Sequence, residues 1–258
     1  MTQQIIDLTT KNSMFKMILD RPGLIEDYIV EYGGWEIGLV RMLASLLKDE
    51  GAFLDIGANI GYYTLFMASS FPNMKCIGFE PHPKIYEQFK RNVTINQFKN
   101  VTTYDYAVGD FNGQTDFHIT RDDHYNKALA AINYYDLLEN DFQKVSVKIV
   151  TVDDILDDET KKNVRAMKID TQGYEYEVIR GAQDLIKKSK PIICFESHSC
   201  SRYSESEIFS LLPDYKIYKI NAWFGELKAY DAPDAKGYSD DLLCIHPDFF
   251  TSSDSLKR

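Results

Sequence analysis

The sequence predicts an α/β domain in which a mainly parallel β-sheet carries helices on both faces. Short β-like runs alternate with helical segments along most of the 258 residues. Five of the β-like runs are almost continuously apolar, as expected for strands that are buried on both faces. A glycine-rich turn joins the first run to the next helix, at the edge where open α/β sheets bind their ligands.

Composition and charge exclude several classes of protein. Hydrophobic residues make up 44% of the chain and charged residues 26%, which is the usual range for a globular domain. The net charge of −10 argues against duplex nucleic acid or an anionic membrane as a partner. We interpret the lysine pairs at 161–162 and 187–188 as solvated helix faces. We therefore expect no nucleic-acid partner.

Cysteine spacing and hydropathy bear on the compartment. The four cysteines lack the spacing of a zinc site or a disulfide framework, which suits a reducing environment. Residues 1–12 are polar and lack the apolar stretch of a signal peptide. No apolar run approaches the ~20 residues of a membrane span. We expect a cytoplasmic protein without a membrane span.

Residues 1–48 are expected to form a helical segment that packs on the core. Residues 14–48 look helical, and apolar side chains at 35–48 recur on one face at helical spacing. Gly33 and Gly34 interrupt the chain before this stretch. The main domain is expected to span residues 49–250, and residues 251–258 to form a flexible tail.

The first half of the main domain shows a regular alternation. We expect strands at 52–56, 75–79 and 101–106, and helices at 62–70 and 83–97. Prolines and glycines punctuate these elements at their ends. The alternation then lapses in an insertion at about 110–163, which contains two β-like runs at 115–120 and 145–150.

The alternation resumes after the insertion. The expected elements are a strand at 166–169, a helix at 174–189, a strand at 191–195, a helix at 205–212, and strands at 215–220 and 241–245. No clear helix separates the last two strands. They are therefore expected to form an antiparallel hairpin on one edge of the sheet.

The strongest local signal is the stretch at residues 53–62, FLDIGANIGY, where the first strand meets a helix. Gly57 and Gly61 permit a tight turn and a close approach of the backbone to a ligand. The helix that follows offers free N–H groups and the positive end of its dipole. The second strand ends in Glu80, which is placed to accept hydrogen bonds from ribose hydroxyls. Together they predict an adenosine-type ligand.

S-adenosylmethionine (SAM) fits this turn better than a dinucleotide does. The G-x-G-x-x-G pattern is not met, because Asn59 and Tyr62 occupy the second and third glycine positions. Asp55 would also place a carboxylate near a pyrophosphate, whereas SAM carries cationic groups and no phosphate. An NAD(P)-dependent oxidoreductase is the alternative enzyme, and a SAM-binding scaffold without turnover is the non-enzymatic alternative.

Further sequence blocks carry a resemblance to a known family. They read WE at 35–36, FLDIGANIGYYT at 53–64, FEPHP at 79–83, AVGD at 107–110, KIDTQGYE at 168–175, GA at 181–182 and FE at 195–196. With these blocks the chain resembles the FkbM-type SAM-dependent methyltransferases from about residue 35 to residue 195. Thr171 and Gln172 stand where many members carry Val-Glu.

The resemblance implies a class I SAM-methyltransferase fold, which is Rossmann-like, with a seven-stranded, mostly parallel sheet and one antiparallel strand near the edge. It also implies methyl transfer to a hydroxyl oxygen of a sugar, glycan precursor or secondary metabolite. The methionine part of SAM would lie against Asp55, Gly57, Ala58, Asn59 and Gly61, the ribose against Glu80, and the adenine against Asp105 and Ala107. The acceptor would be a small molecule or a glycan, and the oligomeric state is not readable.

Three residues are candidates for the chemistry, which requires alignment of the acceptor and removal of a proton. Asp170 ends the fourth strand and is predicted to orient the acceptor hydroxyl or take its proton; capping the next helix is the alternative. Glu175 lies in the first turn of that helix, where the dipole also favours an acid. His198 follows the fifth strand and could act as a general base or be an ordinary loop histidine.

Other features complete the expected site. The carboxylates at the strand ends do not have the spacing of a metal-ligand motif, so no metal is expected. Aromatic residues follow the sixth strand at Trp223, Phe224 and Tyr230. They are candidates to stack on a sugar face, with loop packing as the alternative.

Overall fold

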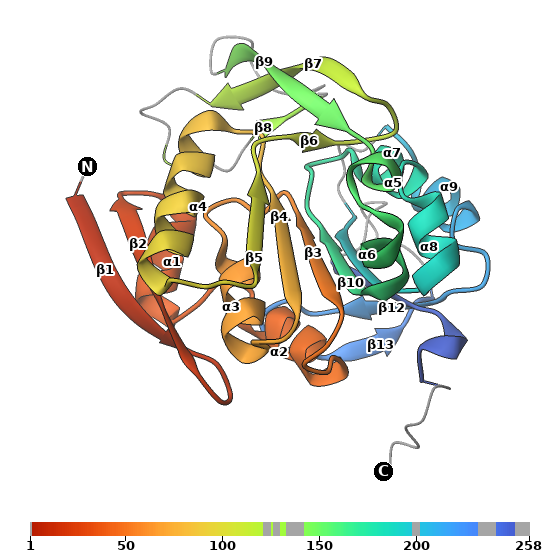
Figure 1. Ribbon diagram of the computed structural model, residues 1–258, viewed down its shortest axis with the longest axis horizontal. Helices are drawn as coiled ribbons and strands as arrows, with labels where there is room; N and C mark the ends of the chain where they lie inside the picture. The colour runs from red at the N-terminus through yellow and green to blue at the C-terminus, as the bar shows by residue number, and fades with distance from the viewer. Residues whose placement is uncertain are drawn as a thin grey trace.

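The computed structural model describes residues 2–120, 125, 130–132, 142–197, 202–231 and 241–250 of the chain. Within these residues, an eight-stranded sheet forms the centre of the protein (Figure 1). In spatial order its strands are β13 (Leu227–Ala229), β12 (Lys216–Ile220), β14 (Asp241–Ile245), β11 (Ile192–Glu196), β10 (Val164–Ile169), β3 (Ala52–Ile56), β4 (Lys75–Phe79) and β5 (Val101–Tyr104).

The direction of the strands confirms a mostly parallel sheet. The neighbours from β11 through β10, β3 and β4 to β5 all pair in parallel. β14 lies between β11 and β12 and is antiparallel to both. The two last predicted strands do pair antiparallel, but they do not form the edge. The short strand β13 takes that place as an eighth strand, and its three exposed residues give no hydrophobic pattern to predict it.

Helices cover both faces of the sheet, as the sequence predicts. The first layer consists of α1 (Leu24–Tyr32), α2 (Ile37–Leu46), α3 (Tyr62–Ser70) and α4 (Pro83–Asn96). The second consists of α5 (Val152–Ile155), α6 (Asp158–Asn163), α7 (Glu175–Arg180), α8 (Gln183–Ser189) and α9 (Glu205–Ser210). Because side chains alternate along a strand, Phe53 of β3 packs into the first core and Leu54 into the second.

The chain begins with a β-hairpin, which corrects the expected helix at residues 14–21. β1 (Thr2–Thr9) pairs with β2 (Met14–Arg21) in antiparallel register. Phe15, Met17 and Leu19 are buried while Met14 and Lys16 are exposed, which is the two-residue period of a strand. The number of apolar residues in this stretch allows a helix, but their spacing of two residues indicates a strand. The hairpin packs beside α4 (Figure 1).

A second sheet takes three of its strands from the predicted insertion and one from residues just before it. Within the described residues its four strands lie in the order β6 (Ala107–Val108), β9 (Phe142–Val150), β7 (Gly113–Thr120) and β8 (Ala130–Ala131). This sheet lies across the end of the central sheet to which β5 points (Figure 1). The insertion therefore places additional residues near the carboxyl ends of the central strands.

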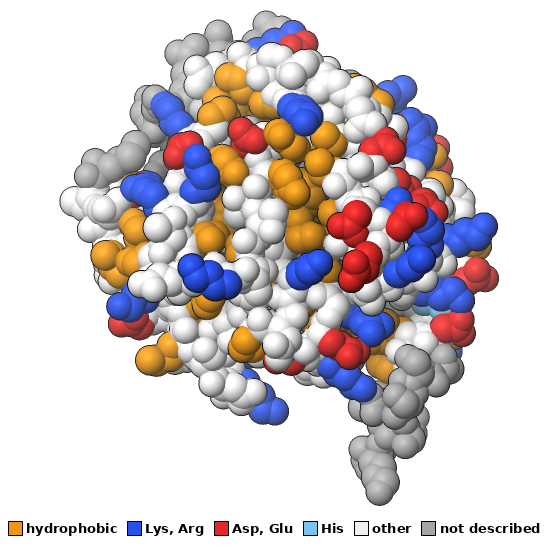
Figure 2. Space-filling model, viewed as in Figure 1, with side chains coloured by type: hydrophobic (Ala, Val, Ile, Leu, Met, Phe, Trp, Pro, Cys, Tyr) orange, Lys and Arg blue, Asp and Glu red, His pale blue; other side chains and the backbone are white. Residues whose placement is uncertain are grey.

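The surface over α6 and α8 carries acidic and basic side chains side by side (Figure 2). Lys161 and Lys188 each form ion pairs with Asp158 and Asp184. Lys188 is exposed, as expected of a solvated helix face, whereas Lys161 is buried, which corrects that interpretation for the first lysine pair. In the part of the chain that the structure describes, no helix is both long and apolar enough to cross a membrane. The expected tail at 251–258 lies outside the described residues, and the division at residue 48 stays a prediction.

Candidate active site

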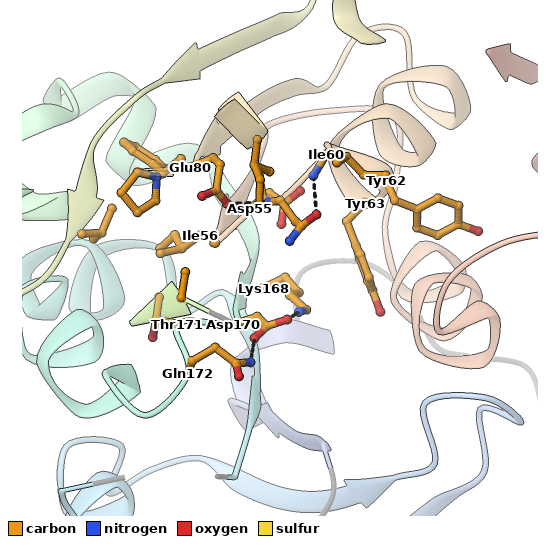
Figure 3. A pocket seen from close by; sticks show the side chains of 18 of the residues that line it. Asp55, Ile56, Ile60, Tyr62, Tyr63, Glu80, Lys168, Asp170, Thr171 and Gln172 are labelled. Carbon is orange, nitrogen blue, oxygen red and sulfur yellow. Dashed lines mark hydrogen bonds and ion pairs between the residues drawn. The ribbon is translucent and has the colours of Figure 1, made fainter. Parts of the chain in front are cut away.

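A cavity of about 220 Å³ lies at the carboxyl ends of β3, β4 and β10. The turn after β3 forms one wall, and the residues that follow β10 form another (Figure 3). The residues just before the insertion, around Ala107, add a third wall, and the segment between α1 and α2 adds a fourth. The cavity therefore lies where ligands bind to open α/β sheets.

The turn after β3 owes its shape to left-handed backbone at three residues. The φ angles are 80° at Gly57, 51° at Asn59 and 89° at Gly61. The amides of Gly57 and Ala58 both donate to the carbonyl of Phe79, over 3.0 and 2.8 Å, and so fasten the turn to the end of β4. These contacts hold the turn in place before any ligand arrives.

Gly57 is required by the protein's own packing. A Cβ atom at this position would lie 1.9 Å from the carbonyl oxygen of Asp170, the residue directly after the neighbouring strand β10. The amide of Asp170 in turn donates to the carbonyl of Ile56 over 2.8 Å. The sequence interpretation attributed the glycine to close approach of a ligand, but the close approach observed here is between two segments of the chain.

Asp55 lies beneath this turn and is completely buried. Its Oδ2 atom accepts hydrogen bonds from the backbone amide of Thr64 over 2.9 Å and from the Thr64 hydroxyl over 2.6 Å. Burial raises the pKa of Asp55 to about 6, although the Thr64 donors oppose the shift. The carboxylate thus fixes the first turns of α3 and adds negative charge to the cavity wall.

Glu80 connects the two strands next to the turn. Its Oε2 atom accepts a hydrogen bond from the amide of Asn59, and its Oε1 atom accepts one from the amide of His82, both over 2.8 Å. Burial raises the pKa of Glu80 to about 7 against the effect of these two donors. A carboxylate has about four acceptor positions, so further donors from a ligand can still be accommodated.

Asp170 lies across the cavity from Glu80 and is held from two sides (Figure 3). Lys168 Nζ lies 2.8 Å from its Oδ2 atom, and Gln172 Nε2 donates to its Oδ1 atom over 2.8 Å. The Gln172 amide also reaches Glu196 Oε2 over 3.3 Å. Gln172, one of the two residues that depart from the family pattern, therefore bridges two carboxylates.

Lys168 is a site residue for which the sequence analysis proposed no role. Its side chain is buried, and burial opposes its charge, but the carboxylates of Asp170, Glu36 and Asp241 raise its pKa well above the usual value. The available signal was a lysine in the second half of strand β10, between apolar neighbours that are buried. Such a residue is rare in a buried strand unless an acid accompanies it.

Glu36 is a second site residue without a predicted role, although it belongs to the WE block. It lines the cavity with φ of 46° and ψ of 49°, a left-handed conformation that few residues other than glycine adopt. The hydroxyl of Tyr63 donates to its Oε2 atom over 2.7 Å. Burial raises the pKa of Glu36, while the charge of Lys168 opposes the shift.

Acidic side chains outnumber basic ones in the lining of the cavity. Among the described residues that line it, the carboxylates are Glu36, Asp55, Glu80, Asp170 and Glu196, and the cation is Lys168. Burial, followed by the charge of Asp170, raises the pKa of Glu196 to about 8. This electrostatic environment favours a ligand that carries positive charge.

Three of the predicted site residues that the structure describes, Glu175, Asp105 and Gly61, are not among the residues that line the cavity. The Oε1 atom of Glu175 accepts hydrogen bonds from Thr171 N, Thr171 Oγ1 and Gly173 N, so this carboxylate ties the loop after β10 to α7. Asp105 is exposed, because β5 ends at Tyr104 and the chain turns before Ala107 reaches the cavity. The roles proposed for Asp105 and Glu175 stay predictions, made for residues that do not line this cavity.

The remaining predicted residues divide as follows. Gly57, Ala58, Asn59 and Ala107 line the cavity with the carboxylates already described, whereas Gly61 packs against the ring of Phe89. His198 lies outside the described residues. Among the described residues, no group of three or more His, Cys, Asp and Glu side chains has an arrangement that could hold a metal ion.

Known proteins with similar sequences are methyltransferases. The "Methyltransferase 1" of Beauveria bassiana is 24% identical over 149 residues, which are 53% of this chain and 60% of that protein. The "2-O-methyltransferase NoeI" of Sinorhizobium fredii is 24% identical over 197 residues, which are 69% of this chain and 77% of that protein. The chain thus spans less than two thirds of the Beauveria protein.

A solved structure and a family model complete the comparison. The crystal structure of the FkbM methyltransferase from Methylobacillus flagellatus has a TM-score of 0.49 and 19% identity, over 78% of this chain and 45% of that chain. The model of the "Methyltransferase FkbM domain" matches residues 55–227, which are more than half of the chain. With the mostly parallel sheet, this match confirms the predicted class I SAM-methyltransferase fold. The chain belongs to the FkbM methyltransferase family.

Proposed function

We propose that the protein is a SAM-dependent O-methyltransferase that acts on a hydroxyl of a sugar, glycan precursor or secondary metabolite. The observation that carries this proposal is the acid-rich cavity at the turn after β3, with Glu80 beside it. SAM bears a sulfonium and an ammonium group, and five acidic side chains against one lysine suit such a cation, because a bound cation favours their ionised forms. The printed name of the NoeI relative, a 2-O-methyltransferase, supports oxygen as the methylated atom.

The chain's own residues supply the binding functions. The backbone at Gly57, Ala58 and Asn59 would face the methionine part, and Glu80 would accept hydrogen bonds from the ribose. Ala107, just before the insertion, would border the adenine. When bound, SAM supplies a methyl group that is already activated by its sulfonium.

Asp170 would orient the acceptor hydroxyl. Hydrogen bonds from Lys168 and Gln172 fix its carboxylate, and such fixed geometry is what alignment of two reactants requires. We therefore assign Asp170 to positioning of the hydroxyl rather than to removal of its proton. His198 stays a candidate for that second role.

The setting of the reaction follows from the sequence. We propose a small-molecule or glycan acceptor and no nucleic-acid partner, because the net charge is −10. We also propose a cytoplasmic enzyme, because the spacing of the cysteines is not that of a disulfide framework.

Calorimetry tests the cofactor, and a coupled assay tests the reaction. Titrations with SAM and S-adenosylhomocysteine should give saturable binding, whereas NADH should give none. Incubation with SAM and a panel of sugar nucleotides and glycans should then release S-adenosylhomocysteine with at least one acceptor. Binding of NADH without binding of SAM would overturn the proposal in favour of an oxidoreductase.

A further inference from the structure

Four aromatic side chains form an exposed group beside the cavity. This aromatic cluster consists of Tyr28 and Tyr32 of α1, Trp35, and Trp223 from the turn between β12 and β13. The ring centroids of Tyr28 and Trp223 are 5.4 Å apart, and those of Trp35 and Trp223 are 5.6 Å apart. The exposed fractions are 36% for Tyr28, 55% for Tyr32 and 38% for Trp223. Large apolar rings gathered on a surface commonly mark a binding site.

The aromatic cluster is continuous with the cavity. Trp35 lines the cavity and also packs edge-on against Tyr28 and Trp223. Its neighbour Glu36 places a carboxylate in the same cavity, and Leu24 and Ile25 from the start of α1 line it too. A molecule resting on the rings would therefore reach the acidic interior without a gap.

The fold holds the two halves of the aromatic cluster together by a close backbone approach. A Cβ atom at Gly38 of α2 would lie 2.1 Å from the amide nitrogen of Gly225, in the turn that carries Trp223. The amide of Leu39 donates to the carbonyl of Ala222 over 2.8 Å. Segments far apart in the sequence are thus fastened to each other at the point where their aromatic side chains meet.

The backbone at Glu36 is an independent indication of function. Glu36 is the N-cap residue of α2, yet its side chain makes no capping hydrogen bond. With a left-handed φ of 46°, it instead directs the carboxylate to the hydroxyl of Tyr63 at the cavity wall. Strained positions of this kind persist mainly at functional sites.

We propose that the aromatic cluster together with Glu36 is the acceptor subsite, and that it receives a pyranose ring. Resting on the proposed function as an O-methyltransferase, this assignment specifies the class of acceptor. A pyranose has an apolar C–H face that can stack on aromatic rings and a rim of hydroxyls that can donate to carboxylates. A lipid chain would instead desolvate those carboxylates without compensation, and an anion would be repelled by them.

The tryptophans give a selective probe of this subsite. The chain contains two of them, Trp35 and Trp223, and both belong to the aromatic cluster. Their emission can be followed while a panel of methyl hexopyranosides is titrated, once with and once without S-adenosylhomocysteine. Cyclohexanol and catechol, which lack either the hydroxyl rim or the saturated ring, are titrated for comparison.

Three variants distinguish stacking of the sugar on Trp223 from effects that follow the loss of any exposed aromatic side chain. Trp223→Ala removes a ring face, Trp223→Phe keeps one, and Phe111→Ala removes an exposed aromatic side chain elsewhere. At least one pyranoside should shift the emission saturably. Trp223→Ala should weaken that affinity about 3- to 10-fold, from the usual strength of an aromatic contact. Trp223→Phe should restore most of it, and Phe111→Ala should change nothing.

The outcomes distinguish the subsite from the cofactor site. The proposal is overturned if no pyranoside shifts the emission at its highest soluble concentration, or if cyclohexanol or catechol binds more tightly than every pyranoside. It is also overturned if Trp223→Ala and Phe111→Ala behave alike. Failure of S-adenosylhomocysteine to bind, with a normal pyranoside response, would instead count against the proposed function and leave the sugar subsite standing.

Discussion

The Oε2 atom of Glu80 accepts a hydrogen bond from the backbone amide of Asn59 over 2.8 Å. This contact joins the end of β4 to the turn after β3, at the residue where that turn has a left-handed φ of 51°. The same carboxylate also accepts the amide of His82. Glu80 therefore shapes the walls of the cavity in addition to offering acceptor atoms to a ribose.

Replacement of Glu80 should weaken SAM binding through both functions. Glu80→Ala leaves the amides of Asn59 and His82 without their acceptor, and Glu80→Gln presents an N–H₂ group to one of them. Hydrogen bonds to a charged group contribute about 1.5–3 kcal/mol each, so the dissociation constant should rise roughly 10- to 100-fold. Calorimetry measures this change, with Asp105→Asn as the exposed control that should bind normally. Normal binding by both Glu80 variants would contradict the assignment.

SAM affinity should rise with pH between about pH 5 and pH 8. Burial raises the pKa of Asp55 to about 6 and that of Glu80 to about 7, so both acids are largely protonated at the lower end of this range. A cationic ligand prefers the ionised forms. Binding should therefore lower both pKa values and release protons, and the affinity should fall as the pH falls through 7 and 6.

Calorimetry in buffers of different ionisation enthalpy measures that proton release. Glu80→Gln is the matched control, since SAM's own amino group titrates alike with both proteins while one carboxylate is missing from the variant. The variant should show a flatter dependence of affinity on pH. Identical slopes for the two proteins would show that Glu80 is not ionised on binding.

Replacement of Asp170 should lower turnover, whereas replacement of Lys168 should lower the stability of the fold. Asp170→Asn should retain SAM affinity but release S-adenosylhomocysteine about 100-fold more slowly with the true acceptor, a typical loss for a misaligned reacting group. Lys168→Met leaves buried carboxylates without their cation and should lower the free energy of unfolding by about 3–5 kcal/mol. Denaturant titration should show partial recovery in the double variant. Unchanged turnover of Asp170→Asn would remove that residue from the site.

The sequence predicted those parts of the fold in which apolar residues follow a regular pattern. Five parallel strands and the turn at Gly57 were predictable, because buried apolar runs and a glycine at a strand end follow directly from sheet geometry. The hairpin at β1 and β2 was missed because the two-residue period of Phe15, Met17 and Leu19 was interpreted as helical. Confusion between the two periods is common when an apolar segment is short.

The site was only partly predictable, because its contacts join distant segments. Asp105 and Glu175 have the right residue type near the right strand ends, but whether a side chain turns inward depends on the backbone between strand and helix. Glu36 and Lys168 reach the cavity from outside the glycine-rich turn, so no local spacing indicates them. Trp223 meets Trp35 only after the chain has folded.

Glycine substitutions separate backbone strain from steric contact. Gly57 and Gly33 have almost the same left-handed backbone, with φ of 80° and 76°. A Cβ atom at Gly33 would meet nothing within 4 Å, whereas one at Gly57 would lie 1.9 Å from the backbone oxygen of Asp170. At Gly61 the obstacle, 2.2 Å away, is the ring of Phe89, a side chain that can shift.

Gly33→Ala should therefore lower the free energy of unfolding by about 1 kcal/mol, the cost of the left-handed conformation alone. Gly57→Ala should cost at least about 2 kcal/mol more, because backbone must move, and Gly61→Ala should fall between them. Denaturant titration gives the three values, and calorimetry should show that SAM binding is lost with Gly57→Ala but kept with Gly33→Ala. Equal costs at Gly33 and Gly57 would mean that the turn after β3 and the loop after β10 are not in contact, and the cavity they enclose would have to be redrawn.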